Sequence, residues 1–152
     1  MLNYWDLKSS QYYFKPVYDL LKQKLLMRPI LHADETYYTV LESKTIKTYY
    51  WVFLSGKHDQ YGITLYHHDP SRSGKVALNF LGNYPGYLRC DMWQAYEQLP
   101  KATLVGCWAH VRRKFHEAVP QQASGKSLAQ KGLNYCNRMF YLEQTWENLS
   151  KQ

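Results

Sequence analysis

The spacing of hydrophobic residues along the chain is first helical and then alternating. In residues 10–27, apolar side chains recur every three or four positions, which predicts one long helix that ends at Arg28 and Pro29. Three segments rich in β-branched and aromatic residues follow, and they predict strands over residues 29–41, 48–54 and 61–67. Because the connections between these segments are short, we expect an antiparallel meander.

Helices and strands alternate in the second half of the chain. Residues 69–73 supply a loop and a helix N-cap, and the helix that follows ends at Gly82 and Asn83. The remaining segments predict a strand over 87–90, a helix over 92–99, a strand over 103–107, a helix over 111–119 and, after a polar break, a helix over 128–149. The pattern predicts an α/β fold with a mixed five-stranded sheet flanked by helices.

This order of elements is that of the ribonuclease H-like fold. In that fold the first and fourth strands lie side by side, and each delivers one acid to the same edge of the sheet. We therefore expect a helical lead-in over residues 1–28, a partial ribonuclease H-like core over 29–119 and a helical segment over 120–152.

Composition and charge narrow the class of partner. The chain has 152 residues, enough for one domain with a core, and a net charge of +7, which favours a polyanion such as nucleic acid. No apolar run approaches the roughly 20 residues of a membrane span, so we expect no membrane partner. The three cysteines are too few and scattered for a secreted disulfide scaffold, which predicts a cytoplasmic protein.

Two segments look like buried strands that end in an aspartate, and they contain Asp34 and Asp91. On a strand, His32 and Asp34 share one face while Glu35 points to the other, so we expect Asp34, not Glu35, to reach a site with Asp91. Two aspartates from separate strands can clamp divalent metal ions for phosphoryl transfer. Read singly, Asp34 is also compatible with a solvated strand end, and Asp91 with a helix cap.

Basic and aromatic residues accumulate close to this candidate site. Cations near a carboxylate site can hold the phosphate backbone of DNA, although a solvated helix face has the same appearance. Trp93 and Trp108 each follow a strand and can stack on an unpaired base, but core packing is the favoured role for both. The candidate DNA-binding residues are Arg72, Lys75, Trp108, His110, Arg112, Arg113 and Lys114.

Cys107 and His110 form a C-x-x-H unit, which resembles half of a structural zinc site. A complete site needs two further ligands, and neither Cys90 nor Cys136 has a partner at matching spacing. We therefore do not expect zinc. Instead, we expect Cys107 to end the fifth strand in the core and His110 to lie near the edge of the sheet.

His110 and Arg113 also fit the H-x-x-R box of tyrosine recombinases, in which Tyr135 or Tyr141 would be the nucleophile. The match is short in a chain with 15 tyrosines. Those recombinases also have a largely helical catalytic domain, and the five predicted strands argue against that reading.

Four segments together resemble the insertion-sequence-66 family of bacterial DDE transposases. They read Leu-His-Ala-Asp-Glu-Thr over 31–36, Ser-Arg-Ser-Gly over 71–74, Gly-Tyr-Leu over 86–88 with Asp91, and Gly-Cys-Trp-Ala-His-Val-Arg-Arg-Lys-Phe over 106–115. The resemblance implies a ribonuclease H-like core, two Mg²⁺ or Mn²⁺ ions and DNA strand cleavage and transfer. Asp34 would be the first catalytic acid and Asp91 the second.

The third acid of the family is a glutamate beyond a helical insertion, in a segment that we do not find in this sequence. We favour its absence, with Glu117 next and Glu143 after it as substitutes within the chain. The resemblance thus implies a central piece of a longer transposase that is inactive alone. Residues 120–152 would begin the insertion, and the partners would be transposon ends, target DNA and further copies of the protein.

Two other functions stay open. The chain can be a non-catalytic remnant that binds DNA through its basic helix. It can also be a ribonuclease H-like nuclease domain that acts in another process, such as repair. Salt-sensitive DNA binding without metal-dependent nicking would favour the remnant.

Overall fold

The computed structural model describes residues 4–40, 47–120 and 127–149. Its backbone contacts divide the chain into two compact units, residues 1–105 and 106–152, and each unit is described by itself. The domain limits that the sequence predicts, after residues 28 and 119, stay a prediction. No helix among the described residues is long and apolar enough to cross a membrane.

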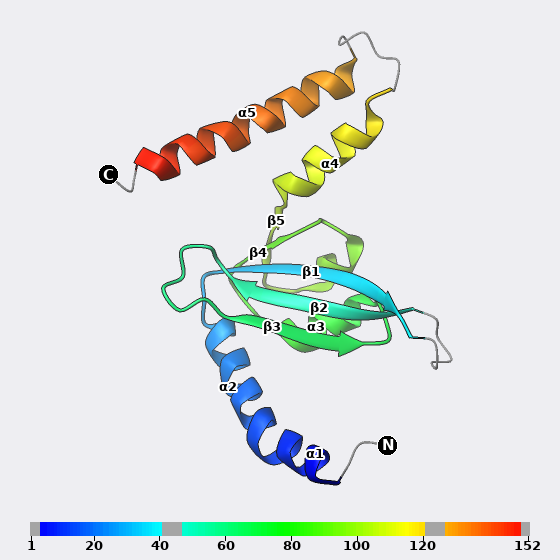
Figure 1. Ribbon diagram of the computed structural model, residues 1–152, viewed down its shortest axis with the longest axis vertical. Helices are drawn as coiled ribbons and strands as arrows, with labels where there is room; N and C mark the ends of the chain where they lie inside the picture. The colour runs from blue at the N-terminus through cyan, green and yellow to red at the C-terminus, as the bar shows by residue number, and fades with distance from the viewer. Residues whose placement is uncertain (1–3, 41–46, 121–126, 150–152) are drawn as a thin grey trace. The chain divides into compact units, whose positions relative to one another are not determined.

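The first unit is built on a five-stranded sheet (Figure 1). Its strands lie in the order β3-β2-β1-β4-β5. β1 pairs antiparallel with β2 and in parallel with β4, and β2 pairs antiparallel with β3. The predicted meander, the mixed sheet and the neighbouring first and fourth strands are thus confirmed. The strand bounds are β1 Ile30–Thr39, β2 Lys47–Ser55, β3 Thr64–Asp69, β4 Tyr87–Cys90 and β5 Thr103–Gly106.

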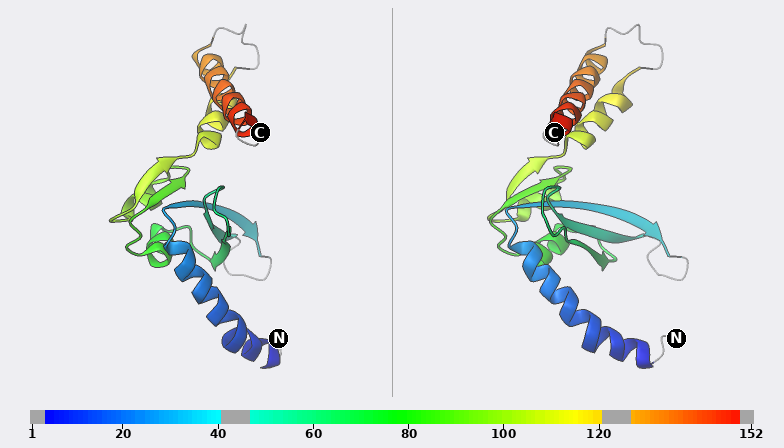
Figure 2. Two further views of the ribbon diagram at one scale, coloured as in Figure 1. Left: turned by 90° about the vertical axis from the view of Figure 1, so that its left-hand side faces the viewer. Right: turned by 60° about the vertical axis from the view of Figure 1, so that its left-hand side comes forward.

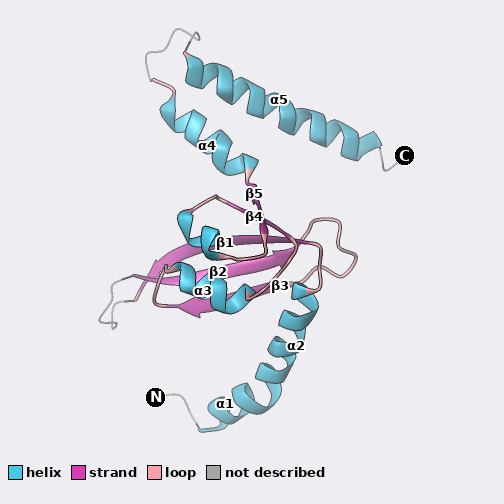
Figure 3. Ribbon diagram, turned by 180° about the vertical axis from the view of Figure 1, so that it is seen from behind, coloured by secondary structure: helices cyan, strands magenta, loops and turns pink. Residues whose placement is uncertain are grey.

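Two short helices cover one face of this sheet. Helix α3 (Gly74–Leu81) and the 3₁₀ helix η2 (Gln94–Gln98) lie in front of the strands when the molecule is seen from behind (Figure 3). A side chain at Gly74 would come within 2.7 Å of the backbone oxygen of Ala95, so glycine permits this close approach. The largest fully buried side chains of this core are Trp51, Tyr96, Phe53, Leu25, Leu31 and Leu88.

The helical lead-in is continuous but not uniform. Helix α1 (Tyr4–Ser9), a π-helical turn η1 (Ser10–Phe14) and helix α2 (Lys15–Leu26) follow one another directly. The apolar spacing predicted one long helix, and Leu25 is the only buried residue of the three elements. Other apolar residues at this spacing, such as Val17 and Leu20, are exposed.

The second unit contains two helices, α4 (Trp108–Ala118) and α5 (Leu128–Leu149), which run side by side in both views of Figure 2. A side chain at Gly132 would overlap the ring of Phe115, so this glycine allows α4 to pack closely against α5. Leu133 and Cys136 are buried at the same contact.

Three predicted boundaries need correction. The third strand begins at Thr64 instead of residue 61, because Tyr61 belongs to the preceding turn. The short helix after β4 is a 3₁₀ helix that begins at Gln94. Helix α4 begins at Trp108, so β5 ends at Gly106 and Cys107 is the N-cap residue of α4.

Candidate functional site

The parallel pairing of β1 with β4 puts the strand that carries Asp34 beside the strand that Asp91 follows. The paired register ends at His32 and Arg89, and continued by two residues along each strand it would match Asp34 with Asp91. Because β1 continues to Thr39, Asp34 lies in the middle of its strand, and the expectation that this strand ends at the aspartate is wrong. The register pairs are Ile30 with Tyr87, Leu31 with Leu88 and His32 with Arg89.

Asp34 and Glu35 lie on opposite faces of β1, as the strand period predicts. Leu31 and Ala33 are buried on the face that α3 covers, and Glu35 follows them in phase with a side chain that is 1% exposed. Asp34 is exposed, and its Oδ1 accepts a hydrogen bond from the backbone N–H of Glu35 at 3.0 Å. Only one acid of the pair therefore lies on each face.

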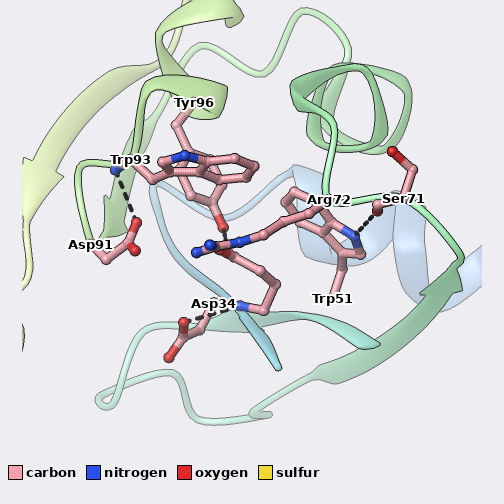
Figure 4. Close-up of polar contacts among 8 residues, drawn as sticks. Asp34, Trp51, Ser71, Arg72, Asp91, Trp93 and Tyr96 are labelled. Atoms are coloured by element: carbon pink, nitrogen blue, oxygen red, sulfur yellow. Dashed lines mark hydrogen bonds and ion pairs between the residues drawn. The ribbon is translucent and has the colours of Figure 1, made fainter. Parts of the chain in front are cut away.

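The buried carboxylate of Glu35 has partners for both of its oxygens, and these partners, Arg72 and Tyr96, lie together with Trp93 in Figure 4. Oε1 accepts hydrogen bonds from Arg72 Nε at 2.9 Å and Nη2 at 2.6 Å, and Oε2 accepts one from the Tyr96 hydroxyl at 2.8 Å. Burial raises the pKa of Glu35, and the bonds from Arg72 and Tyr96 offset only part of that rise. The negative charge of Asp91 acts in the same direction as burial and also raises the pKa of Glu35.

Arg72 joins Glu35 and Tyr96 to the turn after β4. We call Glu35, Arg72, Trp93 and Tyr96 the Glu35 cluster. The guanidinium of Arg72 lies 4.2 Å from the ring centre of Trp93, at a distance typical of a cation–π contact. The backbone N–H of Trp93 donates a hydrogen bond to Asp91 Oδ1 at 2.9 Å. Burial acts to lower the pKa of Arg72, but the hydrogen bond to Glu35 and the nearby acids outweigh it and raise that pKa.

The loop that carries Arg72 is itself tied to the sheet. The indole Nε1 of Trp51 donates to the backbone oxygen of Ser71 at 3.3 Å. Ser73 is the N-cap residue of α3, and its Oγ accepts from the backbone N–H of Lys75 at 3.3 Å. These contacts fix where the Arg72 side chain enters the cluster.

The structure changes the reading of two tryptophans and one cysteine. Trp93 packs partly buried against the core, as predicted, whereas Trp108 is 48% exposed and is not a core residue. Cys107 is half-buried after the end of β5, so its predicted core position is wrong. His110 Nδ1 is buried and has no hydrogen-bond partner within the described part of the chain.

The basic cluster of the second unit lies on α4, where Arg112, Arg113 and Lys114 are all exposed. Arg112 Nε donates to Asn137 Oδ1 on α5 at 2.6 Å. An open groove of about 710 Å³ between the two helices is lined in part by Arg112, Arg113, His116 and Tyr141. The predicted role of this helix in DNA binding stays a prediction.

The two substitute acids also lie in the second unit. Glu117 is exposed on α4 and forms an ion pair of 3.5 Å with Lys114, and Glu143 is exposed on α5. Within residues 4–40, 47–120 and 127–149, no group of three or more histidine, cysteine, aspartate or glutamate side chains is arranged to hold a metal ion.

Sequence reasoning did not identify three members of the Glu35 cluster as functional: Glu35 itself, Trp93 and Tyr96. One signal was available in the sequence. Glu35 lies on the same face of the strand as Leu31 and Ala33, so the strand period predicts an acid on the buried face. A buried acid needs a cation or hydrogen-bond donors. Its actual donors are 37 and 61 residues away in sequence, and periodicity does not identify such distant partners.

The fold and the paired aspartates define the class as an α/β protein with a candidate phosphoryl-transfer site. The chain matches the Transposase IS66 family over residues 1–152, its whole length, and it belongs to that family. The resemblance to the insertion-sequence-66 family is thereby confirmed.

Two relatives come from the bacterium Sinorhizobium fredii. The uncharacterized protein y4qI is 30% identical over an alignment of 118 residues, and the match covers 64% of this chain and 22% of the relative. The uncharacterized protein y4hP is 25% identical over an alignment of 129 residues, and the match covers 77% of this chain and 23% of the relative. The chain thus spans less than a quarter of the length of these curated relatives. No solved structure matches it.

Proposed function

We propose that this chain forms part of the catalytic core of a DNA transposase with a ribonuclease H-like sheet. Three findings support the proposal: family membership, the strand order β3-β2-β1-β4-β5, and the parallel pair β1–β4. The parallel pairing of β1 with β4 carries it, because Asp34 on β1 and Asp91 directly after β4 would then come from neighbouring strands, and two such acids are suited to bind divalent metal ions.

Asp34 and Asp91 fit a hard cation in their chemistry, since carboxylate oxygens are ligands that Mg²⁺ and Mn²⁺ prefer. They account for two protein ligands, and the described residues bring no third acid to them. When bound, the ions would supply activation of the attacking oxygen and charge neutralisation at the phosphate. The third acid, for which Glu117 and Glu143 are the candidates within this chain, belongs to the same proposal.

The DNA would be held by the basic helix α4. Its three consecutive cations are exposed, and phosphate contacts of this kind position a duplex without reading its sequence. We expect the affinity of the chain for DNA to fall steeply as salt rises. The charge-neutralising variant Lys114→Gln, measured against Lys24→Gln on α2, would report by fluorescence anisotropy whether α4 contributes.

Metal binding is the direct test of the candidate site. We expect Mn²⁺ to broaden the backbone amide resonances around Asp34 and Asp91 in the ¹⁵N spectrum of this chain. Asp34→Asn and Asp91→Asn should each remove the broadening from both segments. The matched control is Asp19→Asn, which removes an equal charge from the exposed face of α2.

Two results would count against the proposed site. One is broadening centred on other acids of the chain, and the other is broadening that persists in Asp34→Asn. Because the test reads metal binding and not DNA cleavage, it does not require the third acid to be present.

A non-catalytic role in DNA binding is the second candidate. It is favoured by the absence of a three-acid cluster within the described residues, together with the exposed cations of α4. DNA affinity that depends on α4, combined with no Mn²⁺ effect at Asp34 and Asp91, would select it.

A further inference from the structure

The Glu35 cluster lies directly against the backbone of both candidate metal ligands. The N–H that donates to Asp34 Oδ1 belongs to Glu35, and the N–H that donates to Asp91 Oδ1 belongs to Trp93. Glu35 and Trp93 are in turn joined by Arg72, which bonds the first and stacks on the second. Each aspartate is therefore one hydrogen bond away from a residue of the cluster.

Glu35 does not serve as the missing third acid in this arrangement. Its side chain is 1% exposed, and its two oxygens accept hydrogen bonds from Arg72 and Tyr96. To bind a metal ion, it would have to give up partners that compensate the burial of its charge. Glu35 also lies on the face of β1 opposite to Asp34. The hydrogen bonds of Glu35 instead suit it to hold neighbouring backbone segments in place.

Three segments meet in this cluster. Glu35 comes from β1, Arg72 from the loop before α3, and Trp93 and Tyr96 from the N-cap and the body of η2. Arg72 and Tyr96 bond the carboxylate of Glu35, and Trp93 packs on Arg72. The backbone of the two aspartates is thus joined across the sheet by side chains of the covered face, in addition to the strand pairing.

The turn that carries Asp91 shows a second sign of constraint. Met92 has φ of 63°, in the left-handed region that a side chain other than glycine rarely adopts. The hydrogen bond from the Trp93 N–H to Asp91 spans Met92, and Trp93, the residue after Met92, is held by its cation–π contact with Arg72. Strained residues of this kind persist where the surroundings determine them, often at functional sites.

We propose that Glu35, Arg72, Trp93 and Tyr96 form a positioning network that holds the carboxylates of Asp34 and Asp91 ready for a divalent ion. The inference rests on the proposed function for the identity of the ligand. The network itself touches no substrate. It acts through the backbone N–H groups of Glu35 and Trp93 and so corresponds to the outer shell that orients metal ligands in proteins.

The first experiment measures the network without metal. Hydrogen exchange of the Trp93 amide should be faster in Arg72→Gln than in the parent chain, because the turn loses the side chain that Trp93 packs on. Amides of β2 report any general loss of stability, and the change at Trp93 should exceed theirs. The Tyr96→Phe variant, which removes a single hydroxyl, should produce a smaller change in the same direction. Unchanged Trp93 exchange in both variants would overturn the proposal.

The second experiment measures Mn²⁺ affinity through the broadening of the Asp34 and Asp91 amides. We expect Glu35→Gln and Arg72→Gln to weaken binding by about tenfold, the size typical of outer-shell changes. Arg72→Lys should recover part of the loss because it restores the charge. The control is Thr48→Val, which removes a buried hydrogen bond to His68 outside the network, on the face of the sheet opposite to Glu35, and should leave Mn²⁺ affinity unchanged.

The two experiments separate the two ideas. If the parent chain binds no Mn²⁺ at the aspartates, the proposed function fails, while the exchange of Trp93 still decides the network. If Mn²⁺ binds and Glu35→Gln and Arg72→Gln bind it as well as the parent, the function stands and the network is overturned. A loss of affinity of equal size in Thr48→Val would show general destabilisation and would also overturn it.

Discussion

Asp34 and Glu35 are neighbours in sequence but lie on opposite faces of β1, and the two faces differ in exposure to solvent. Asp34 is exposed and accepts a hydrogen bond from the adjacent backbone N–H, whereas Glu35 is buried with partners for both oxygens. A carboxylate in solvent keeps oxygen atoms available for a ligand. A carboxylate buried with all its donors satisfied contributes to local order instead. The comparison assigns binding to the exposed acid and positioning to the buried one.

The largest expected effect is on stability, at the covered face. Arg72→Ala leaves a buried carboxylate without its cation, and loss of one partner of such a pair costs about 3 kcal/mol. Lys75→Ala removes an exposed cation three residues away and should change the free energy of unfolding by less than about 0.5 kcal/mol. Urea denaturation of the two variants gives the comparison, and equal costs would show that Glu35 does not depend on Arg72.

The next contrast is between the two acids themselves. Glu35→Gln keeps the shape but weakens charge-assisted hydrogen bonds, so we expect a loss of about 1–2 kcal/mol in unfolding free energy. Asp34→Asn should cost less than about 0.5 kcal/mol, as is usual for an exposed position. Metal affinity should show the reverse order, with Asp34→Asn the more damaging change. The assignment of roles would be wrong if Asp34→Asn destabilised the fold more than Glu35→Gln.

These contrasts also mark what could be predicted from the sequence. Local patterns predicted the meander, the position of β4 and the opposite directions of Asp34 and Glu35, because a strand period depends only on neighbouring residues. The order of the elements, interpreted as that of the ribonuclease H-like fold, added the prediction that β1 lies beside β4. The partners of Glu35 were not predicted, because they depend on how the loop before α3 and the turn after β4 fold back onto the sheet.

The helices illustrate the same limit. The apolar spacing of residues 10–27 correctly predicted helical structure, but it did not show that only Leu25 would be buried. Hydrophobic periodicity predicts which side chains share a face of the helix, but it does not predict whether another element covers that face. Similarly, the C-x-x-H spacing of Cys107 and His110 did not reveal that Cys107 precedes a helix instead of ending a strand.

A smaller effect is expected from the neutral donor of the cluster. Tyr96→Phe removes one hydrogen bond to Glu35 Oε2 and keeps the buried ring, so we expect a loss of about 1 kcal/mol at neutral pH. Urea denaturation measures it. Tyr66→Phe, an exposed hydroxyl on β3, is the matched control and should have almost no effect.

A pH-dependent change should appear in alkaline solution, and it tests the same hydroxyl in a different way. Burial, followed by the charge of Glu35, raises the pKa of Tyr96 well above its ordinary value of 10. In the unfolded chain the phenol ionises near pH 10, while in the folded chain it stays protonated. The stability contributed by Tyr96 is therefore present below pH 10 and falls as the pH rises above it, by about 1.4 kcal/mol per pH unit.

Tyr96→Phe has no such group, so its disadvantage relative to the parent chain should shrink above pH 10 and then reverse. Burial also raises the pKa of Tyr84, to about 12, and this tyrosine serves as the comparison because its hydroxyl bonds the backbone oxygen of Arg28 instead of a carboxylate. Tyr84→Phe should remove the part of the alkaline loss of stability that is due to Tyr84 and leave the part that is due to Tyr96. Urea denaturation midpoints at pH 8, 10 and 11 for the parent chain, Tyr96→Phe and Tyr84→Phe measure both contributions. A constant difference between the parent and Tyr96→Phe across this range would mean that the Tyr96 hydroxyl titrates as readily in the folded chain as in the unfolded one, and that the face bearing Glu35 is open to water.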